Sequence, residues 1–133
     1  MKYLLDTNTC IRYINGRAPK IRERMLAISD SDITISTVTA GEMYVGSAKS
    51  QTPEQSRAKQ EAFFIRFALV TFDMPAAYEF GRIRAHLEKA GTPIGPFDMQ
   101  IAAVGVANGL IVVTHNVAEF ERIPWLHIED WEA

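Results

Sequence analysis

Short apolar segments alternate along this chain with longer segments of helical periodicity, and no other feature constrains the fold as much. We expect strands at Lys2–Leu5, Asp32–Ser36, Leu69–Phe72, Leu110–Thr114 and Leu126–Ile128. We expect helices at Asn8–Asn15, Pro19–Ile28, Val38–Lys49, Pro53–Ala68, Pro75–Ala90 and Asp98–Asn108. Strands that alternate with helices form right-handed βαβ units. The sequence therefore predicts an α/β fold of three layers, α/β/α, with a mostly parallel central sheet of four to five strands.

The length of the chain predicts a single domain over residues 1–133, because 133 residues can bury a core without disulfides or a structural metal. The lone Cys10 cannot form an internal disulfide, which favours a packed thiol in a reducing cytoplasm. The N-terminal apolar run is interrupted at Asp6, and no stretch reaches the roughly 18 apolar residues that span a bilayer. We expect neither secretion nor membrane insertion.

Four acidic side chains lie at strand ends or on the helices that flank them: Asp6, Glu42, Asp98 and Glu119. Asp6 follows the first strand directly, and Glu119 lies shortly after the fourth. Ligands of open α/β sheets bind outside the carboxyl ends of the strands. We therefore predict that these acids meet in one crevice.

Each acid also has a purely structural interpretation. Asp6 and Asp98 could be helix N-caps, although an N-cap does not prevent a carboxylate from binding a ligand. Glu42 shares one side of its helix with Val38 and Val45, and it could simply lie at the edge of the core. These alternatives stay open from the sequence.

The segment after the fourth strand offers several further polar groups. Asn116 could bind a hard cation through its amide oxygen, and Glu119 could do so directly or through water. Thr114 could hold Asp6 by a hydroxyl hydrogen bond, or it could be an exposed strand end. The sequence does not decide between Asn116 and Glu119.

Crowded carboxylates favour a bound cation. Two of them about 5 Å apart repel by roughly 3 kcal/mol at an effective dielectric of 20. Oxygen-only ligands indicate Mg²⁺ or Mn²⁺, because zinc normally uses Cys and His at short spacing, and His86, His115 and His127 lack such spacing. Metal-assisted hydrolysis of a phosphodiester fits these residues, since it needs no protein nucleophile.

The net charge is −2, which argues against strong indiscriminate binding to nucleic acid. The distribution is uneven, however, because residues 1–97 carry 13 basic and 10 acidic side chains while residues 98–133 carry 1 and 6. This unevenness indicates either ordinary solvated faces or a basic rim beside an acidic pocket. A rim would include Arg17, Lys20, Arg22 and Arg24.

Four motifs in register resemble the PIN-domain ribonucleases, and most closely the VapC toxins of bacterial toxin–antitoxin pairs. The motifs are LDTN at 5–8, TAGEMYVG at 39–46, GPFDMQIAA at 95–103 and VTHNVAEF at 113–120. The resemblance implies that Asp6, Glu42 and Asp98 are metal-binding catalytic acids. It further implies supporting roles for Thr7, Asn8 and Thr114. The last motif departs from the family pattern, which often has Asp where this chain has Asn116 or Glu119.

Similarity to VapC implies Mg²⁺-dependent RNA cleavage, a homodimer, and neutralisation by a VapB antitoxin whose C-terminal segment covers the toxin's groove. The tail, residues 120–131, looks like that of the subgroup which cuts initiator transfer RNA. In this context the four basic residues, Arg17, Lys20, Arg22 and Arg24, are expected to hold the RNA backbone, or else to form a solvated face or the antitoxin's surface.

Three other interpretations are weaker or less specific. A haloacid dehalogenase-type phosphatase needs a second Asp where this chain has Asn8, and a receiver domain with Asp73 as phosphoacceptor needs an early acidic pair and a late Lys. A non-catalytic binding module of the same fold is consistent with Asn116 in place of an acid. Loss of RNA cleavage on chelation of metal would separate the enzyme from the binding module.

Overall fold

The computed structural model covers all 133 residues, and its centre is a five-stranded sheet. The strands are β1 (Tyr3–Leu5), β2 (Ile33–Ser36), β3 (Ala68–Val70), β4 (Ile111–Val113) and β5 (Ile128–Glu129). They lie in the order β3-β2-β1-β4-β5, and every neighbouring pair is parallel. The predicted parallel sheet is confirmed.

Seven helices surround this sheet. They are α1 (Thr7–Ile14), α2 (Pro19–Ala27), α3 (Thr37–Lys49), α4 (Pro53–Phe64), α5 (Met74–Ala90), α6 (Pro96–Ala107) and α7 (Val117–Phe120). Proline is the first residue of α2 and α4, where its missing N–H costs nothing. Gly91 ends α5 at a φ of 70°, which glycine adopts without strain. The six predicted helices are confirmed, whereas α7 and the short 3-10 turn Asp30–Asp32 were not predicted.

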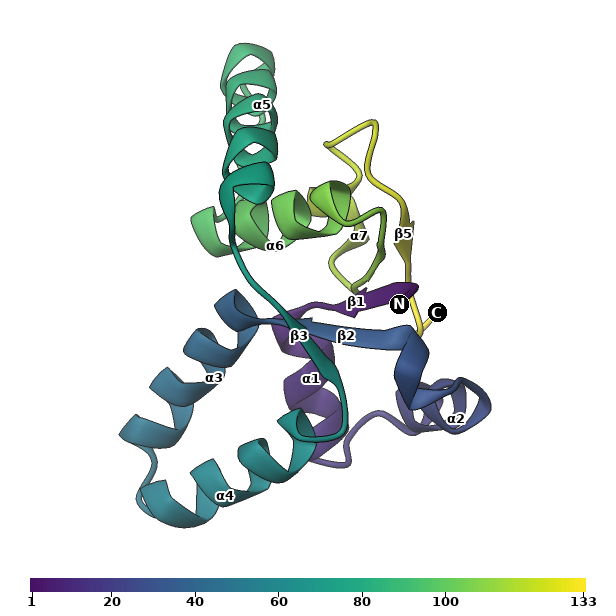
Figure 1. Ribbon diagram of the computed structural model, residues 1–133, viewed down its shortest axis with the longest axis vertical. Coiled ribbons are helices and arrows are strands. Elements are labelled where there is room, and N and C mark those ends of the chain that lie inside the picture. Colours follow the sequence, from purple (N-terminus) through teal and green to yellow (C-terminus); the bar gives the residue numbers. More distant parts are fainter.

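The sheet separates two hydrophobic clusters, which makes the fold three-layered. Tyr3 and Leu5 of β1 point into the cluster formed with α1 to α4, and Leu4 points into the cluster formed with α5, α6 and α7. This alternation follows from the two-residue period of a strand. Figure 1 shows the first helix group below the sheet and the second above it. The predicted α/β/α architecture is confirmed.

Two predicted boundaries near residue 68 are wrong. The fourth helix ends at Phe64, not at Ala68, because Ala68 pairs with Thr34 as the first residue of β3. The strand itself ends at Val70, two residues before the predicted end at Phe72. None of the helices combines the length and the apolar composition needed to cross a bilayer.

Candidate active site

The carboxyl end of β1 is the point from which the site is built. Leu5, its last residue, pairs with Ile35 of β2 on one side and with Val113 of β4 on the other. The chain order of the strands reverses here, which places a crevice outside these strand ends. Asp6 follows Leu5, and Thr114 follows Val113. Both are buried.

Asp6 is the N-cap of α1, as its structural interpretation predicted. Its Oδ1 accepts a hydrogen bond from the backbone N–H of Thr9 at 2.9 Å, and this contact fixes the carboxylate at the strand end. Burial raises the pKa of Asp6, although hydrogen bonding from Thr114 and Thr9 acts in the opposite direction. Because Asp6 caps α1 and is also buried at the switch point, its carboxylate is held in a fixed position at the strand end.

Glu42 reaches the site from α3 through a hydrogen bond to α1. The Thr7 hydroxyl donates to Glu42 Oε1 at 2.6 Å and also contacts Thr39 Oγ1 at 3.1 Å. The prediction that Val45 marks a buried side of α3 is wrong, since Val45 is 54% exposed. Thr7, rather than core packing, orients Glu42.

Asp98 lies in the first turn of α6 and is not the N-cap, contrary to one of the interpretations above. The helix begins at Pro96, and Gly95 is the cap residue without a side chain to do the capping. Proline prefers the first helical position, so the chain places Asp98 third. Its carboxylate is therefore not used by the cap.

Glu119 lies on α7, which follows β4 through a short turn. The backbone N–H of Asn116 donates to Thr114 Oγ1 at 2.9 Å and closes this turn. Asn116 precedes α7, and its side chain does not cap the helix. Asn8, in contrast, is exposed on α1.

The four acids interact electrostatically. The pKa of Asp98 is raised to about 6, first by burial and then by the negative charges of Asp6, Glu42 and Glu119. Acids from four separate segments are therefore near enough for their charges to interact, and their role as one site stays a prediction. No three acidic, histidine or cysteine side chains stand together at the spacing of a metal-ligand set, however. The four carboxylates interact electrostatically and do not form a preassembled cluster.

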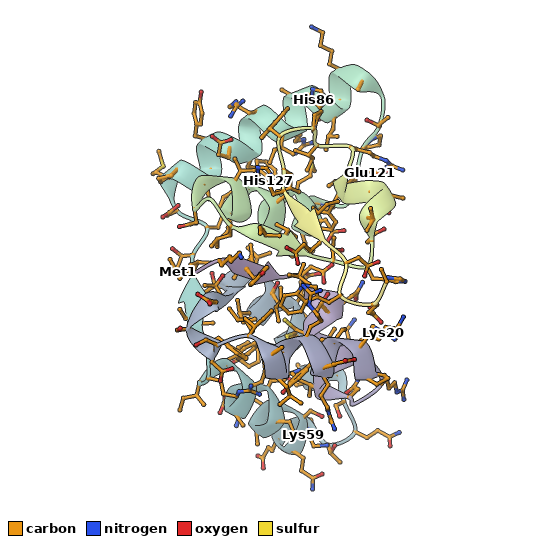
Figure 2. All side chains as sticks on the ribbon, turned by 90° about the vertical axis from the view of Figure 1, so that its right-hand side faces the viewer. Met1, Lys20, Lys59, His86, Glu121 and His127 are labelled. Carbon is orange, nitrogen blue, oxygen red and sulfur yellow. The ribbon has the colours of Figure 1, made fainter.

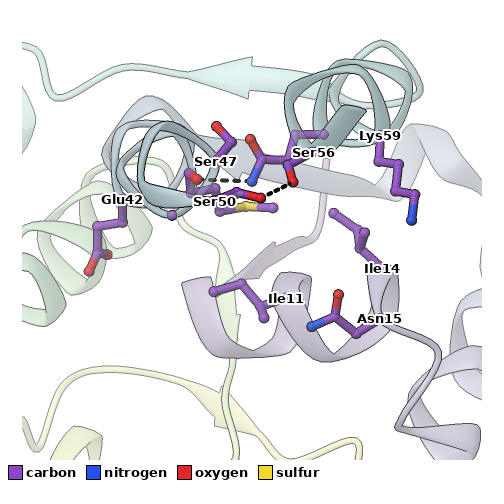
Figure 3. Close-up of a pocket in the computed structure, with 11 residues that line it drawn as sticks. Ile11, Ile14, Asn15, Glu42, Ser47, Ser50, Ser56 and Lys59 are labelled. Atoms are coloured by element: carbon purple, nitrogen blue, oxygen red, sulfur yellow. Dashed lines mark hydrogen bonds between the residues drawn. The ribbon is translucent and has the colours of Figure 1, made fainter. Parts of the chain in front are cut away.

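Two pockets open in this part of the molecule, and Glu42 is the only one of the four acids that lines either of them. One, of about 340 Å³, lies between α1, α3 and α4, with Glu42 at one end and Lys59 at the other (Figure 3). The other, of about 470 Å³, lies between α1, the turn after β4 and the C-terminal tail, and Asn8 and Asn116 line it. Ile11 borders both pockets.

The four basic residues of the predicted rim have different surroundings. Arg24 forms an ion pair with Glu129 at 2.9 Å, and the Lys20 ammonium donates to the backbone oxygen of Ala133 at 3.3 Å. Arg17 and Arg22 are exposed near the turn between α1 and α2. Contacts with the C-terminal tail thus engage two of the four, and RNA binding by this set stays a prediction.

Sequence reasoning missed Arg12 and Glu132. Arg12 Nε donates to Glu132 Oε1 at 2.6 Å, and both side chains line the pocket that contains Asn8 and Asn116. No local pattern marks this pair, because the partners are 120 positions apart. The only signal was the tail tryptophan, Trp131, whose burial brings Glu132 back to α1.

The three histidines do not form a metal site. His86 packs against Trp125 with 5.2 Å between ring centroids, and it lies with His127 in the half of the molecule opposite Lys59 (Figure 2). His115 is exposed beside the acids, and its Nδ1 contacts the Asp130 carboxylate at 3.0 Å. The carboxylates remain the natural cation ligands of this site.

Comparison with known proteins agrees with the fold and with the four motifs. The PIN domain family model matches residues 3–126. The chain is 45% identical to the tRNA(fMet)-specific endonuclease VapC of Salmonella typhimurium and 34% identical to ribonuclease VapC2 of Rickettsia felis, over 98% and 99% of both sequences. The solved DNA-bound VapBC of Salmonella typhimurium superposes with a TM-score of 0.93 at 44% identity, covering 98% of each chain. The VapBC2 structure from Rickettsia felis, bound to a promoter DNA fragment, gives 0.92 at 32% identity, covering 98% of this chain and 99% of that one. The chain therefore belongs to the PIN-domain family, in its VapC branch.

Proposed function

We propose that this chain is a cytoplasmic endoribonuclease toxin of a VapBC pair, and that it hydrolyses phosphodiester bonds in transfer RNA. The observation that carries the proposal is the placement of Asp6 at the switch point of the sheet, with Glu42 held by Thr7 of the helix that Asp6 caps. Asp98 lies near enough for the charges of both acids to raise its pKa. The names of the relatives support RNA as substrate, and the first of them specifies tRNA(fMet). Initiator transfer RNA is accordingly the target we propose.

The cofactor we propose is Mg²⁺, for which Mn²⁺ can substitute. PIN-domain nucleases generally depend on a divalent metal, and carboxylate oxygens are the ligands such hard cations prefer. Asp6 and Asp98, with Glu42 and Glu119, would hold it once their side chains turn toward one another, because the four interact electrostatically without standing at ligand spacing. When bound, the cation supplies Lewis acidity that activates water and offsets the charge on the leaving oxygen.

The protein's own groups orient the acids for this chemistry. The Thr9 N–H holds Asp6, and the Thr7 hydroxyl holds Glu42. The turn closed by Thr114 sets the start of α7 and so places Glu119. These contacts are the basis for the supporting roles that we assign to Thr7 and Thr114. Asn8 and Asn116 line the adjacent pocket, where their amides can bind RNA.

Cleavage of initiator transfer RNA by the purified protein tests this function. We expect cleavage with Mg²⁺ that EDTA stops and that Asp6→Asn abolishes. Asp73→Asn is a matched control, because Asp73 also caps a helix, accepting from the Ala76 N–H at 3.2 Å, but lies outside the site. Asparagine retains the capping ability of both residues. Full activity in Asp6→Asn, or equal loss in Asp73→Asn, would refute the assignment.

We further propose that the pocket between α1, α3 and α4 receives a segment of a VapB-type antitoxin. The observations that support this are its position beside Glu42 and its mixed lining of Ile11, Ile14 and Met43 with polar side chains. The structural neighbours are VapBC complexes. Co-expression with the antitoxin is expected to suppress cleavage, and Ile14→Asp to restore it while leaving the free toxin active.

A homodimer is the quaternary state we propose. The edge strand β3 and the start of α5 expose several large apolar side chains in succession: Leu69, Phe72, Met74 and Tyr78. Met74 and Tyr78 are 81% and 68% exposed, and contiguous exposed apolar surface marks protein interfaces. Analytical ultracentrifugation is expected to show a dimer that Met74→Asp converts to a monomer. A monomeric wild type would contradict the proposal.

A further inference from the structure

The pocket of about 470 Å³ beside the acids has a mixed-charge lining that the proposed function leaves unexplained. Its six lining residues are Asn8, Ile11, Arg12, His115, Asn116 and Glu132. The pocket carries negative charge close to the candidate active site, because Glu132 lines it and the charge of Glu132 acts on Asp6. An RNA strand that reaches the four candidate active-site acids has to bring its phosphates close to negative charges, which is unfavourable without a nearby cation.

Arg12 is the permanently charged cation of this pocket, and the protein holds it at two points. Its Nε donates to Glu132 Oε1 at 2.6 Å, and its Nη2 donates to the backbone oxygen of Arg17 at 3.4 Å. Its Nη1 has no partner in the protein. The side chain is 44% exposed, so this held guanidinium remains open to a ligand. A fixed guanidinium with unused donors matches the geometry of a phosphate.

Glu132 is placed by the fold of the C-terminal tail. Trp131 is buried against Tyr3, with ring centroids 5.1 Å apart, and the Glu132 N–H donates to Asp130 Oδ1 at 2.9 Å. The Glu132 side chain is only 12% exposed, and its second oxygen, Oε2, is buried without a hydrogen-bond partner. Its negative charge acts on Asp6, which shows how near the pair lies to the candidate active site.

A buried carboxylate without full hydrogen bonding is costly, so its position calls for a function. Replacing the charge by an apolar group would be the cheaper structural solution. What Glu132 achieves in the structure is to fix Arg12 at the wall of the pocket. The other basic residues nearby do not compete for this role, because Arg12 is the only Lys or Arg side chain that lines the pocket.

We propose that Arg12 binds a phosphate of the RNA strand next to the scissile bond, and that Glu132 is the positioning residue that aims its guanidinium. The proposal rests on the proposed ribonuclease function and names a substrate contact within it. His115, which contacts Asp130, lines the same pocket as a second hydrogen-bonding group.

Fluorescence anisotropy tests the role of Arg12 by measuring how Asp6→Asn protein binds initiator transfer RNA over a range of salt concentrations. Adding Arg12→Gln is expected to weaken binding about tenfold, the range of one charge-assisted hydrogen-bond contact. The slope of log Kd against log salt is expected to fall by about 0.7 to 0.9, the value of one phosphate contact. Arg84→Gln is the control, because Arg84 forms a comparable exposed ion pair with Glu88 at 2.8 Å on α5.

Two substitutions of Glu132 separate positioning from charge. Glu132→Gln and Glu132→Ala both remove the negative charge, but only glutamine keeps an oxygen that can accept from Arg12 Nε. We expect Glu132→Gln to retain the salt dependence of the parent, and Glu132→Ala to approach that of Arg12→Gln. The double variant Arg12→Gln, Glu132→Ala is expected to bind no more weakly than Arg12→Gln alone.

The outcomes distinguish this inference from the proposed function. An unchanged salt slope in Arg12→Gln, or identical behaviour of the two Glu132 variants, would overturn the inference even when the wild type cuts RNA. A wild type that binds transfer RNA without cutting it would overturn the proposed function and leave the Arg12 comparison decisive. Failure of the wild type to bind transfer RNA would overturn both.

Discussion

Replacing Asp98 by asparagine is expected to stabilise the metal-free protein while abolishing cleavage. The pKa of Asp98 is raised from 3.8 to about 6, so its charged form is disfavoured in the folded chain relative to the unfolded one. Without solvent screening, this rise in pKa corresponds to a free-energy cost of about 3 kcal/mol for the charged form. Solvent screening of a half-buried group reduces this to about 1 kcal/mol. For a domain of this size, that is a rise in Tm of about 4 °C.

The sign of the pH dependence follows from the direction of this shift. Between about pH 4 and pH 6 the folded protein holds the Asp98 proton more tightly than the unfolded chain, so stability declines as the pH rises through this window. The amide introduced by Asp98→Asn does not titrate and resembles a protonated carboxyl group in shape. The stability gap between variant and wild type is therefore expected to be small near pH 4 and to reach its full value above pH 6.

Thermal melts of both proteins in EDTA at several pH values measure this gap. The difference between two proteins cancels the titration of distant groups to first order, so the comparison isolates Asp98 and its neighbours. A variant that is less stable than the wild type at pH 7.5 would refute the reasoning. A gap that does not change with pH would refute it equally, because the pKa of Asp98 would then not be raised in the folded protein.

Two other substitutions test how the site is supported. Gly105→Ala is expected to destabilise the protein by about 1–2 kcal/mol in urea unfolding, because a Cβ there would lie 2.8 Å from Cγ2 of the buried Val112. This steric clash outweighs the gain in helix propensity. An unchanged or raised stability would show that α6 is not packed tightly on β4. Thr7→Val is expected to lower kcat about tenfold and the free energy of unfolding by about 1 kcal/mol, because the 2.6 Å hydrogen bond that orients Glu42 is lost. Thr7→Ser keeps the hydroxyl and is expected to retain the activity and the stability of the wild type. Equal effects of the two Thr7 variants would contradict this role.

The sheet and the position of Asp6 were predictable because they depend on local patterns. Alternating segments of period two and period 3.6 identify βαβ units, and parallel strands bring their carboxyl ends to one edge. Asp6 and Thr114 meet there because Leu5 and Val113 are paired in register. The predicted start of α6 at Asp98 was wrong by two residues, because Pro96 takes the first helical position, which proline prefers.

The groups that depend on tertiary packing were not predictable. The partner of Glu42 is Thr7, 35 positions away, while the neighbour used to judge its burial, Val45, is exposed. Glu132 reaches the pocket only because Trp131 packs on Tyr3. No spacing along the chain encodes such a contact, so the sequence offered no reason to single out Arg12. The basic side chains near α2 were instead considered for the RNA backbone, with a solvated face or the antitoxin's surface as alternatives.

Locating bound Mn²⁺ by anomalous scattering in crystals of the wild-type protein tests the central claim most directly. We expect a peak in the crevice, with oxygens of Asp6 and Asp98 at about 2.1 Å, near the ideal length for such ions. The same soak of the Asp6→Asn, Asp98→Asn double variant is expected to show no peak. A wild-type crevice without a peak, or a peak held by other residues, would contradict the account.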